Sequence, residues 1–224
     1  MSAQLSPATA RRVSRRWPVI SGGTAIALVV VLGLVITLRQ GSVEVDAEWM
    51  EEIIEHRHPA WEIPSLVMNF LGGGWFGAIL VPVGGAIALL IARKRWSALY
   101  FVLASALSAG LVQVLKAVFG RARPEWMLIP LDSASFPSGH VANAATVAVV
   151  LGLLVGRAWV WVSGAAWVVL MLLSRTYLGV HWLSDTLGGV LLGAAVAVIV
   201  WAPLADRLEP EWRRGAPSVA SVSP

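Results

Sequence analysis

The side chains best suited to chemistry are a small set of cations, two histidines and one carboxylate in the second half of the chain. In sequence order they are Lys116, Arg121, Arg123, His140, Arg175, His181 and Asp185. Positive side chains bind anions, imidazoles attack or transfer protons near neutral pH, and a carboxylate can orient an imidazole. Together these residue types indicate chemistry on a phosphate group.

His181 and Asp185 are spaced as a nucleophile and its partner. On a helix, residues four apart share one face, so the carboxylate can accept a hydrogen bond from one imidazole nitrogen. That bond would fix the tautomer and leave the other nitrogen free to attack. His140 supplies a second imidazole, which could protonate a leaving group. The combination predicts phosphoryl transfer through a phosphohistidine, without a metal ion or other cofactor.

The segment Pro137-Ser138-Gly139-His140 has the composition of a helix start. Ser138 is a candidate N-cap, after which the free backbone N–H groups and the helix dipole would attract negative charge. Gly139 would let a ligand approach the backbone closely. The donors of this segment, added to three cations, suit a tetrahedral phosphate better than a carboxylate. Those cations are Lys116, Arg123 and Arg175.

The composition places these residues in a membrane protein. The 224 residues are 57% hydrophobic and 13% charged, and the mean hydropathy is +0.73. Soluble domains are far less apolar, so a soluble globule is excluded. The absence of cysteine excludes disulfides, thiolate nucleophiles and cysteine metal sites. The net charge of +4 comes from basic residues that flank apolar runs, which encodes membrane topology and argues against a nucleic-acid partner.

Six stretches without Asp, Glu, Lys or Arg are long enough to cross a bilayer, which takes about 20 residues. Gly72 to Gly74 interrupt the second stretch, which predicts a surface helix up to Leu71 and a span from Trp75 to Ala92. The expected fold is therefore an all-α, polytopic membrane helical bundle with six transmembrane helices. The six stretches are Trp17–Leu38, one within Ile63–Ala92, Trp96–Leu115, Ser133–Gly156, Ala158–Ser174 and His181–Ala205.

These boundaries divide the chain into a cytoplasmic tail (1–16), a six-span domain (17–205) and a cytoplasmic tail (206–224), of which Glu209 onward is expected to be disordered. The first stretch follows four arginines and could be a signal peptide. Its apolar core is longer than the usual ~7 to 15 residues of a signal peptide, which favours a membrane anchor.

The positive-inside rule sets the orientation, because cytoplasmic segments are enriched in Lys and Arg. With both termini inside, eleven of the seventeen basic residues are cytoplasmic. Consecutive spans alternate in direction, so every candidate site residue then lies at an outer helix end. A single Lys, Arg or His at a helix end often has no function, because its side chain simply reaches the interface between membrane and water. A cationic cluster on the side where the rule predicts few cations instead implies a bound anion. The eleven residues are Arg11, Arg12, Arg15, Arg16, Arg93, Lys94, Arg95, Arg157, Arg207, Arg213 and Arg214.

The outer segment 44–62 is acidic and has apolar residues at helical spacing, among them Trp49, Met50, Ile53 and Ile54. This pattern predicts a short amphipathic helix on the outer surface. A metal site is an alternative that the pattern does not require, because acidic residues on the wet face of such a helix need no ligand. Its candidate ligands are Glu51, Glu52, Glu55, His56 and His58.

Three segments, Lys116 to Pro124, Pro137 to His140 and Ser174 to Asp185, resemble the signature motifs of the type 2 phosphatidic acid phosphatase superfamily. They cover residues 116–185. The resemblance implies a six-span helical bundle with an outward-facing active site. Soluble vanadate-dependent haloperoxidases carry a similar constellation, but six spans argue against that alternative.

The resemblance also implies roles for individual residues. His181 would be the nucleophile, Asp185 its orienting partner, and His140 the acid and then the base. The phosphate binders would be Lys116, Arg123, Ser138, Gly139 and Arg175, with Ser174 and Pro124 as positioning residues.

The expected activity is hydrolysis of a lipid phosphate or diphosphate that enters from the outer leaflet. Undecaprenyl diphosphate, phosphatidylglycerophosphate and phosphatidic acid all fit, because the motifs recognise phosphate and the lipid tail would face generic apolar surface. Arg121 is additional to the motif and could bind a second phosphate, which would favour a diphosphate. The alternative is a non-catalytic phosphate-binding membrane scaffold or transporter, which would need the cations but not the pairing of His181 with Asp185.

A stripe of small residues, Gly189, Gly193 and Ala197, lies on the last span. Such a stripe could form a dimer interface, but packing within the same bundle is the more common use and is the interpretation favoured here. The oligomeric state stays open at this point.

Overall fold

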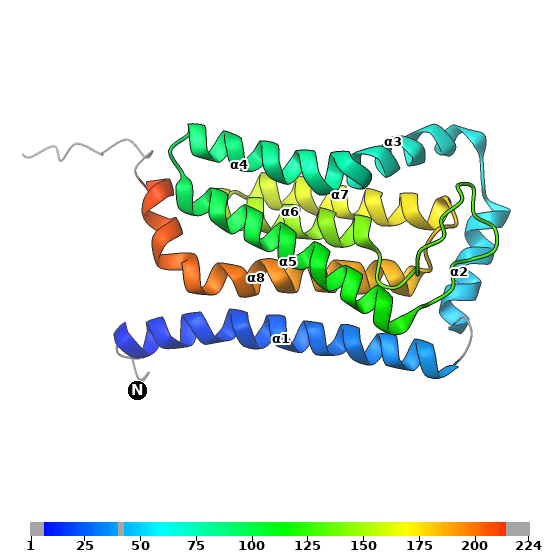
Figure 1. The fold of residues 1–224 in the computed structure, drawn as a ribbon, viewed down its shortest axis with the longest axis horizontal. Helices are drawn as coiled ribbons and strands as arrows, with labels where there is room; N and C mark the ends of the chain where they lie inside the picture. The colour runs from blue at the N-terminus through cyan, green and yellow to red at the C-terminus, as the bar shows by residue number, and fades with distance from the viewer. Residues whose placement is uncertain (1–6, 40–42, 214–224) are drawn as a thin grey trace, which may run out of the picture.

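The computed structural model describes residues 7–39 and 43–213, with side chains at 16–39 and 43–212, and these residues form helices and loops without a strand (Figure 1). Eight α-helices make up the bundle. They are α1 (Pro7–Arg39), α2 (Glu44–Glu55), α3 (Glu62–Gly72), α4 (Val81–Ile91), α5 (Arg95–Phe119), α6 (Gly139–Val155), α7 (Ala158–Tyr177) and α8 (Leu183–Arg213). A 3-10 turn, η1 (Pro59–Trp61), precedes α3, and a π-helical turn, η2 (Phe76–Leu80), precedes α4.

Four helices are long and apolar enough to cross a membrane: Arg16–Arg39 of α1, α5, α7, and Leu183–Trp212 of α8. A fifth candidate is the bent pair Pro59–Gly72 and Phe76–Ile91, whose two halves meet at 42°. The apolar helix α6 has 17 residues. The predicted all-helical membrane bundle is thus confirmed, with four to five candidate spans.

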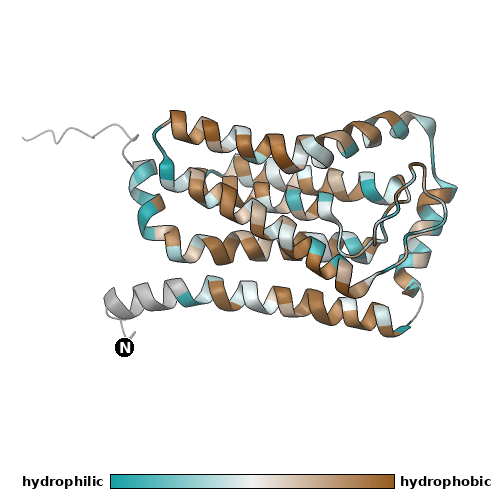
Figure 2. Cartoon of the chain, viewed as in Figure 1, coloured by the Kyte–Doolittle hydropathy of each residue, from teal (hydrophilic) through white to brown (hydrophobic). Residues whose placement is uncertain are grey.

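Hydrophobic residues, brown in Figure 2, occur along most of the helices, and many large apolar side chains are exposed on the outside of the bundle. Val31, Ile87 and Val162 are each more than half exposed. Soluble proteins rarely show apolar surface of this extent, whereas hydrocarbon is a favourable environment for it. The chain is a multi-pass membrane protein.

The break between α3 and α4 falls at the predicted glycines, but α3 is not a separate surface helix. It packs against α7 and α6, and beyond the break α4 continues the chain at an angle of 42° to it (Figure 1). Ser65 and Gly72 of α3 are buried. α3 packs into the bundle in place of the expected surface position because Ser65 is buried and Asn69 contacts His140 and Arg175, whereas Glu62 at its start is exposed.

α6 begins at Gly139, directly after Ser138, so the helix start predicted at Pro137 to His140 is confirmed. The charge-free stretch from Ser133 to that point belongs to the loop 120–138, whose Ser135 N–H donates to the Arg121 carbonyl at 2.8 Å. The last span was expected from about His181, and α8 begins at Leu183.

The carboxyl-terminal boundary is also corrected, because α8 continues to Arg213 where disorder was expected from Glu209. Glu211 explains the extension. Its carboxylate accepts hydrogen bonds from the Trp96 and Ser97 N–H groups at 2.9 and 3.0 Å, and so caps the start of α5. An anion is favoured there by the helix dipole. The rest of the expected tail, 214–224, lies outside the described residues, as do 1–6.

The closest helix packing is between α6 and α8. A side chain on Gly193 would meet the Ala142 carbonyl oxygen at 2.1 Å, and one on Gly189 would meet the Ser138 carbonyl oxygen at 2.7 Å. Ala197 is fully buried, and its carbonyl accepts the Tyr100 hydroxyl of α5 at 3.0 Å. The stripe of small residues therefore packs within the bundle, as favoured from the sequence, and it brings the first turns of α6 and α8 together.

α2 lies across one end of the bundle, beside the loop 120–138 (Figure 1). It contacts α8 and α7. Of its residues, only Asp46 and Met50 are buried, which confirms an amphipathic helix at this end.

Candidate active site

The predicted site residues converge on one cavity of about 260 Å³ at the α2 end of the bundle. Three helices line it, α5, α6 and α7, together with the break between α3 and α4, the turn before α8 and the loop 120–138. Of the eleven residues singled out from the sequence, six line this cavity. They are Lys116, Arg123, Gly139, His140, Arg175 and His181.

Arg175 carries the strongest sign of an anion site. Its side chain is fully buried, and its Nη1 donates to the Asn69 Oδ1 at 2.6 Å. Its Nε and Nη2 lie buried without a hydrogen-bond partner among the described residues. Buried guanidinium donors that lack a partner are costly, and two adjacent N–H groups match two oxygens of a phosphate. The chemistry of this donor set fits a tetrahedral oxyanion.

Lys116 and Arg123 complete the cationic wall. The Lys116 Nζ donates to the carbonyls of Ala134 and Ser135. The Arg123 guanidinium donates to the Ser133 carbonyl at 2.8 Å and the Ser133 hydroxyl at 3.0 Å. These carbonyl contacts hold both cations at the cavity wall without cancelling their charge.

His181 and Asp185 are paired as predicted, but not on a shared helix face. His181 lies in the turn before α8, and its Nδ1 is 3.4 Å from the Asp185 Oδ2. The same carboxylate oxygen accepts the Trp182 N–H at 2.9 Å. The His181 Nε2 faces Arg123, whose Nη1 is 3.4 Å away. An imidazole with Nδ1–H toward a carboxylate keeps its Nε2 lone pair for attack.

Burial, reinforced by the nearby charges of Arg175, Arg123 and Lys116, lowers the pKa of His181 well below 6.5. The imidazole is therefore neutral at physiological pH. A neutral imidazole is the nucleophilic form.

His140 occupies the first turn of α6, beneath the break between α3 and α4. Its Nε2 lies 3.1 Å from the Asn69 carbonyl oxygen. A side chain on Gly73 would lie 2.0 Å from the same nitrogen, so the break packs directly on the imidazole. His140 and His181 thus reach one cavity from different helices.

Ser138 is the residue before α6, as predicted, yet its hydroxyl forms no cap. Its Oγ is buried without a partner among the described residues, while its N–H donates to the Asp185 carbonyl at 2.9 Å. Ser174 is also buried, and its Oγ has no hydrogen-bond partner in the described part of the chain. Pro124 is buried in the loop 120–138 and does not line the cavity.

The structure corrects the interpretation of Arg121 as a binder of a second phosphate. Its Nη1 donates to the Asp185 Oδ1 at 2.6 Å, and its Nη2 donates to the Asp46 Oδ2 at 2.7 Å. Both terminal nitrogens are therefore engaged by buried carboxylates. Arg121 does not line the cavity that holds the two histidines.

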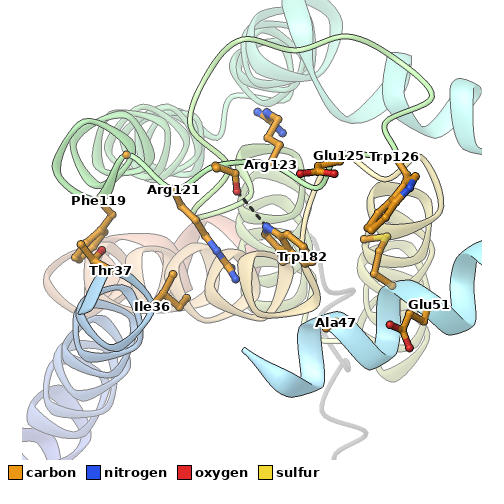
Figure 3. A pocket seen from close by; sticks show the side chains of 13 residues that line it. Ile36, Thr37, Ala47, Glu51, Phe119, Arg121, Arg123, Glu125, Trp126 and Trp182 are labelled. Carbon is orange, nitrogen blue, oxygen red and sulfur yellow. Dashed lines mark hydrogen bonds between the residues drawn. The ribbon is translucent and has the colours of Figure 1, made fainter. Parts of the chain in front are cut away.

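A larger cavity of about 520 Å³ lies beside this network, between α1, α2 and the start of the loop 120–138 (Figure 3). In its wall the Trp182 indole donates to the Ala122 carbonyl at 3.0 Å, and Arg121 lies 5.4 Å from the Trp182 ring centre. Arg123 lines both cavities. It therefore marks the point where they approach each other.

Three site residues were missed from the sequence: Asn69, Asn143 and Asp46. Asn69 contacts both His140 and Arg175. The Asn143 Nδ2 donates to the Gly77 carbonyl at 2.9 Å and holds the break over the cavity. Asn143 could have been found from the sequence, because it is an asparagine in an apolar stretch, one helical turn after His140. No local pattern marked Asn69 or Asp46.

The alternative metal site on α2 is only partly assembled. Glu52, Glu55 and His56 bring their ligand atoms within 4.8 Å of one another, and all three are exposed. His58 instead accepts the Ala60 N–H at 3.2 Å and caps the turn η1. Exposed acidic residues of this kind need no metal.

Comparison with known proteins identifies the family. The sequence profile of the PAP2 superfamily matches residues 97–208. The chain belongs to the PAP2 superfamily. It is an integral-membrane PAP2 lipid phosphatase, a hydrolase, and the resemblance drawn from the three motifs is confirmed.

The names of proteins similar to this PAP2 chain mention several different substrates. It is 34% identical over 143 residues to phosphatidylglycerophosphatase B of Bacillus subtilis, covering 59% of this chain and 70% of that protein. It is 34% identical over 128 residues to the undecaprenyl-diphosphatase of Sulfolobus acidocaldarius, covering 54% and 61%. The crystal structure of a transmembrane PAP2-type phosphatidylglycerolphosphate phosphatase from Bacillus subtilis superposes with a TM-score of 0.68 at 27% identity, covering 81% of this chain and 96% of that one.

Proposed function

We propose that this PAP2 chain hydrolyses lipid phosphates or diphosphates at the outer face of a cell membrane, through a phosphohistidine on His181. The observation that carries the proposal is the convergence of two imidazoles and three cations on one cavity, with two Arg175 donors left unpartnered. The names of the relatives support phosphatidylglycerophosphate and undecaprenyl diphosphate as substrates to test first.

In the proposed first step, the phosphate sits among Lys116, Arg123 and Arg175, beside the start of α6, where Gly139 lines the cavity. The His181 Nε2 attacks phosphorus in line with the bond to the lipid oxygen. A phosphorus–nitrogen bond forms, the phosphorus–oxygen bond breaks, and His140 donates a proton to the departing oxygen. Charge on the equatorial oxygens is stabilised by the cations, which is the main catalytic contribution in phosphoryl transfer.

In the second step, His140 takes a proton from water, and the resulting hydroxide equivalent attacks the phosphohistidine. The phosphorus–nitrogen bond breaks, inorganic phosphate leaves, and His181 returns to its neutral form. Asp185 supports both steps by holding Nδ1–H, so that the imidazolium formed during the cycle is stabilised. Ser174 and Pro124 position this machinery without contacting phosphate.

The proposal is tested by phosphate release from purified protein in detergent with excess chelator, across a panel of lipid phosphates and diphosphates. His181→Ala should lower kcat at least about a thousandfold, as removal of a nucleophile does in other enzymes. The exposed His56→Ala on α2 is the matched control. Phosphate binding without release by the wild-type chain would instead indicate a scaffold or transporter. Retained turnover in His181→Ala would overturn the assignment of the nucleophile.

We further propose six membrane crossings with both termini in the cytoplasm. The four long helices, the bent pair around the glycine break and the 17-residue helix α6 supply six candidates. Because the chain has no cysteine, single cysteines can report the topology. An impermeant maleimide should label Glu48→Cys from outside the cell and Arg157→Cys only after permeabilisation. The reverse pattern would overturn the orientation.

A further inference from the structure

The acidic helix α2 reaches the catalytic pair through a buried chain of charges. Asp46 is 1% exposed, unlike the other acidic residues of α2, which are not buried. Its Oδ2 accepts the Arg121 Nη2 at 2.7 Å, and the other end of the same guanidinium binds the Asp185 Oδ1 at 2.6 Å. Asp185 in turn faces the His181 Nδ1. Three side chains, Asp46, Arg121 and Asp185, thus connect α2 to the proposed nucleophile.

Ser184 ties the same carboxylate to the start of α8. Its N–H and hydroxyl donate to the two oxygens of Asp46 at 2.8 and 2.6 Å. The Arg121 Nη1 also donates to the Ser184 hydroxyl at 2.7 Å. Asp46 therefore holds both Arg121 and the backbone next to Asp185, which leaves the first turn of α8 little freedom to rotate.

The two oxygens of Asp185 have separate partners. Arg121 binds Oδ1, whereas Oδ2 faces His181 and the Trp182 N–H. With Oδ1 held by Arg121 and Oδ2 by the Trp182 N–H, the carboxylate has a fixed orientation, so Arg121 helps to determine where the oxygen that faces the His181 Nδ1 lies. We infer that Asp46 and Arg121 are positioning residues that act through Asp185 on His181.

The charges support a role beyond a mechanical tie. Asp185 must keep enough negative charge to stabilise a protonated His181, but an ion pair with Arg121 alone would neutralise that charge. Asp46 shares the guanidinium and leaves the trio of Asp46, Arg121 and Asp185 with a net charge of −1. Without Asp46, the charges of Arg121 and Asp185 would cancel, and no net negative charge of this network would oppose Lys116, Arg123 and Arg175.

Neither residue touches the substrate in this account. The cavity that holds the two histidines is lined by neither Asp46 nor Arg121. Their loss should therefore change kcat and leave KM nearly unchanged, as expected for an interaction felt mainly in the transition state. A purely structural tie would lower the yield of folded protein and leave kcat per folded enzyme intact.

The test compares Asp46→Asn with Glu48→Gln, an exposed residue of the same helix that loses the same charge. Turnover is measured per folded enzyme after size-exclusion chromatography. We expect Asp46→Asn to lower kcat about 10- to 100-fold with KM within about threefold, because misplacement of a catalytic group by about 1 Å can cost 10²-fold. Equal kcat in the two variants would overturn the inference.

A pair of substitutions at Arg121 makes the test independent of whether Asp46→Asn folds. Arg121→Lys keeps the positive charge but cannot hold two carboxylates in the planar geometry of a guanidinium, so its kcat should lie between those of the wild type and Arg121→Ala. A kcat of Arg121→Lys no higher than that of Arg121→Ala would overturn the inference.

The inference rests on the proposed function, and the two can fail separately. Turnover that survives in His181→Ala contradicts the proposed nucleophile. An inactive His181→Ala together with an unaffected Asp46→Asn contradicts only the role of Asp46 and Arg121.

Discussion

Replacing Gly73 by alanine would place a methyl group against the His140 imidazole. The new Cβ would lie 2.0 Å from Nε2, 2.2 Å from Cε1 and 2.7 Å from Cδ2. The backbone of Gly73, with φ −143° and ψ −164°, is one that alanine can adopt, so the effect is steric and not conformational. Ordinary contact needs about 3.5 Å, so the ring or the glycine break must move by roughly 1.5 Å.

A displacement of this size should impair proton transfer by His140. Misplacing a catalytic group by about 1 Å can cost 10²-fold in rate, so we expect kcat of Gly73→Ala to fall about 100-fold. Gly84→Ala is the matched control, because it makes the same change on α4 where nothing lies within 4 Å of the new atom. Phosphate release and thermal unfolding should be measured on both variants.

The reasoning would be refuted if Gly73→Ala kept kcat within twofold of the Gly84→Ala control while remaining folded. That result would show either that His140 tolerates displacement or that it takes no part in proton transfer. A lower unfolding temperature with unchanged kcat would point to packing alone. A large loss of kcat at an unchanged unfolding temperature would support a catalytic role for His140.

Three further predictions follow from packing, charge and titration. Gly193→Ala should lower the free energy of unfolding by about 1–3 kcal/mol, because the new Cβ would lie 2.1 Å from the Ala142 carbonyl oxygen. Thermal unfolding measures this loss, with Gly110→Ala as the control, since nothing lies within 4 Å of a Cβ at that position. Arg121→Ala should lower activity on lipid monophosphates and diphosphates by the same factor, and a selective loss on diphosphates would restore the second-phosphate interpretation. Burial lowers the pKa of His181, so its ring should stay neutral as the pH falls through 6.5 and become charged only near the lowered pKa. NMR titration of the histidines, assigned with His181→Ala, would contradict this if His181 became protonated at or above pH 6.5.

The convergence of the site could be predicted because it follows from topology. Consecutive spans alternate in direction, so residues at the ends of neighbouring helices meet on one side of the membrane. Lys116, His140, Arg175 and His181 were grouped in this way, and all four line the cavity. The proximity of His181 and Asp185 was also predicted, but for the wrong structural reason. The two residues do not share a helix face; a turn and the hydrogen bond from the Trp182 N–H bring them together.

The contributions of α2 and α3 could not be predicted, because they depend on contacts far apart in the sequence. Asp46 lies 138 residues from its partner Ser184, and Asn69 lies 106 residues from Arg175. In the sequence, Asp46 is one of several acids in a wet segment, and only burial distinguishes it. The helical end of the chain was missed for the same reason, since Glu211 caps α5 across 115 residues.

Trapping the covalent intermediate tests the central claim most directly. The purified chain should be mixed with a radiolabelled lipid phosphate or diphosphate, quenched in alkaline detergent during turnover, and analysed by peptide mass spectrometry. The account predicts an acid-labile phosphate on His181 that is absent in His181→Ala. Label on another residue, or turnover by the wild-type chain with His181 never phosphorylated, would contradict it.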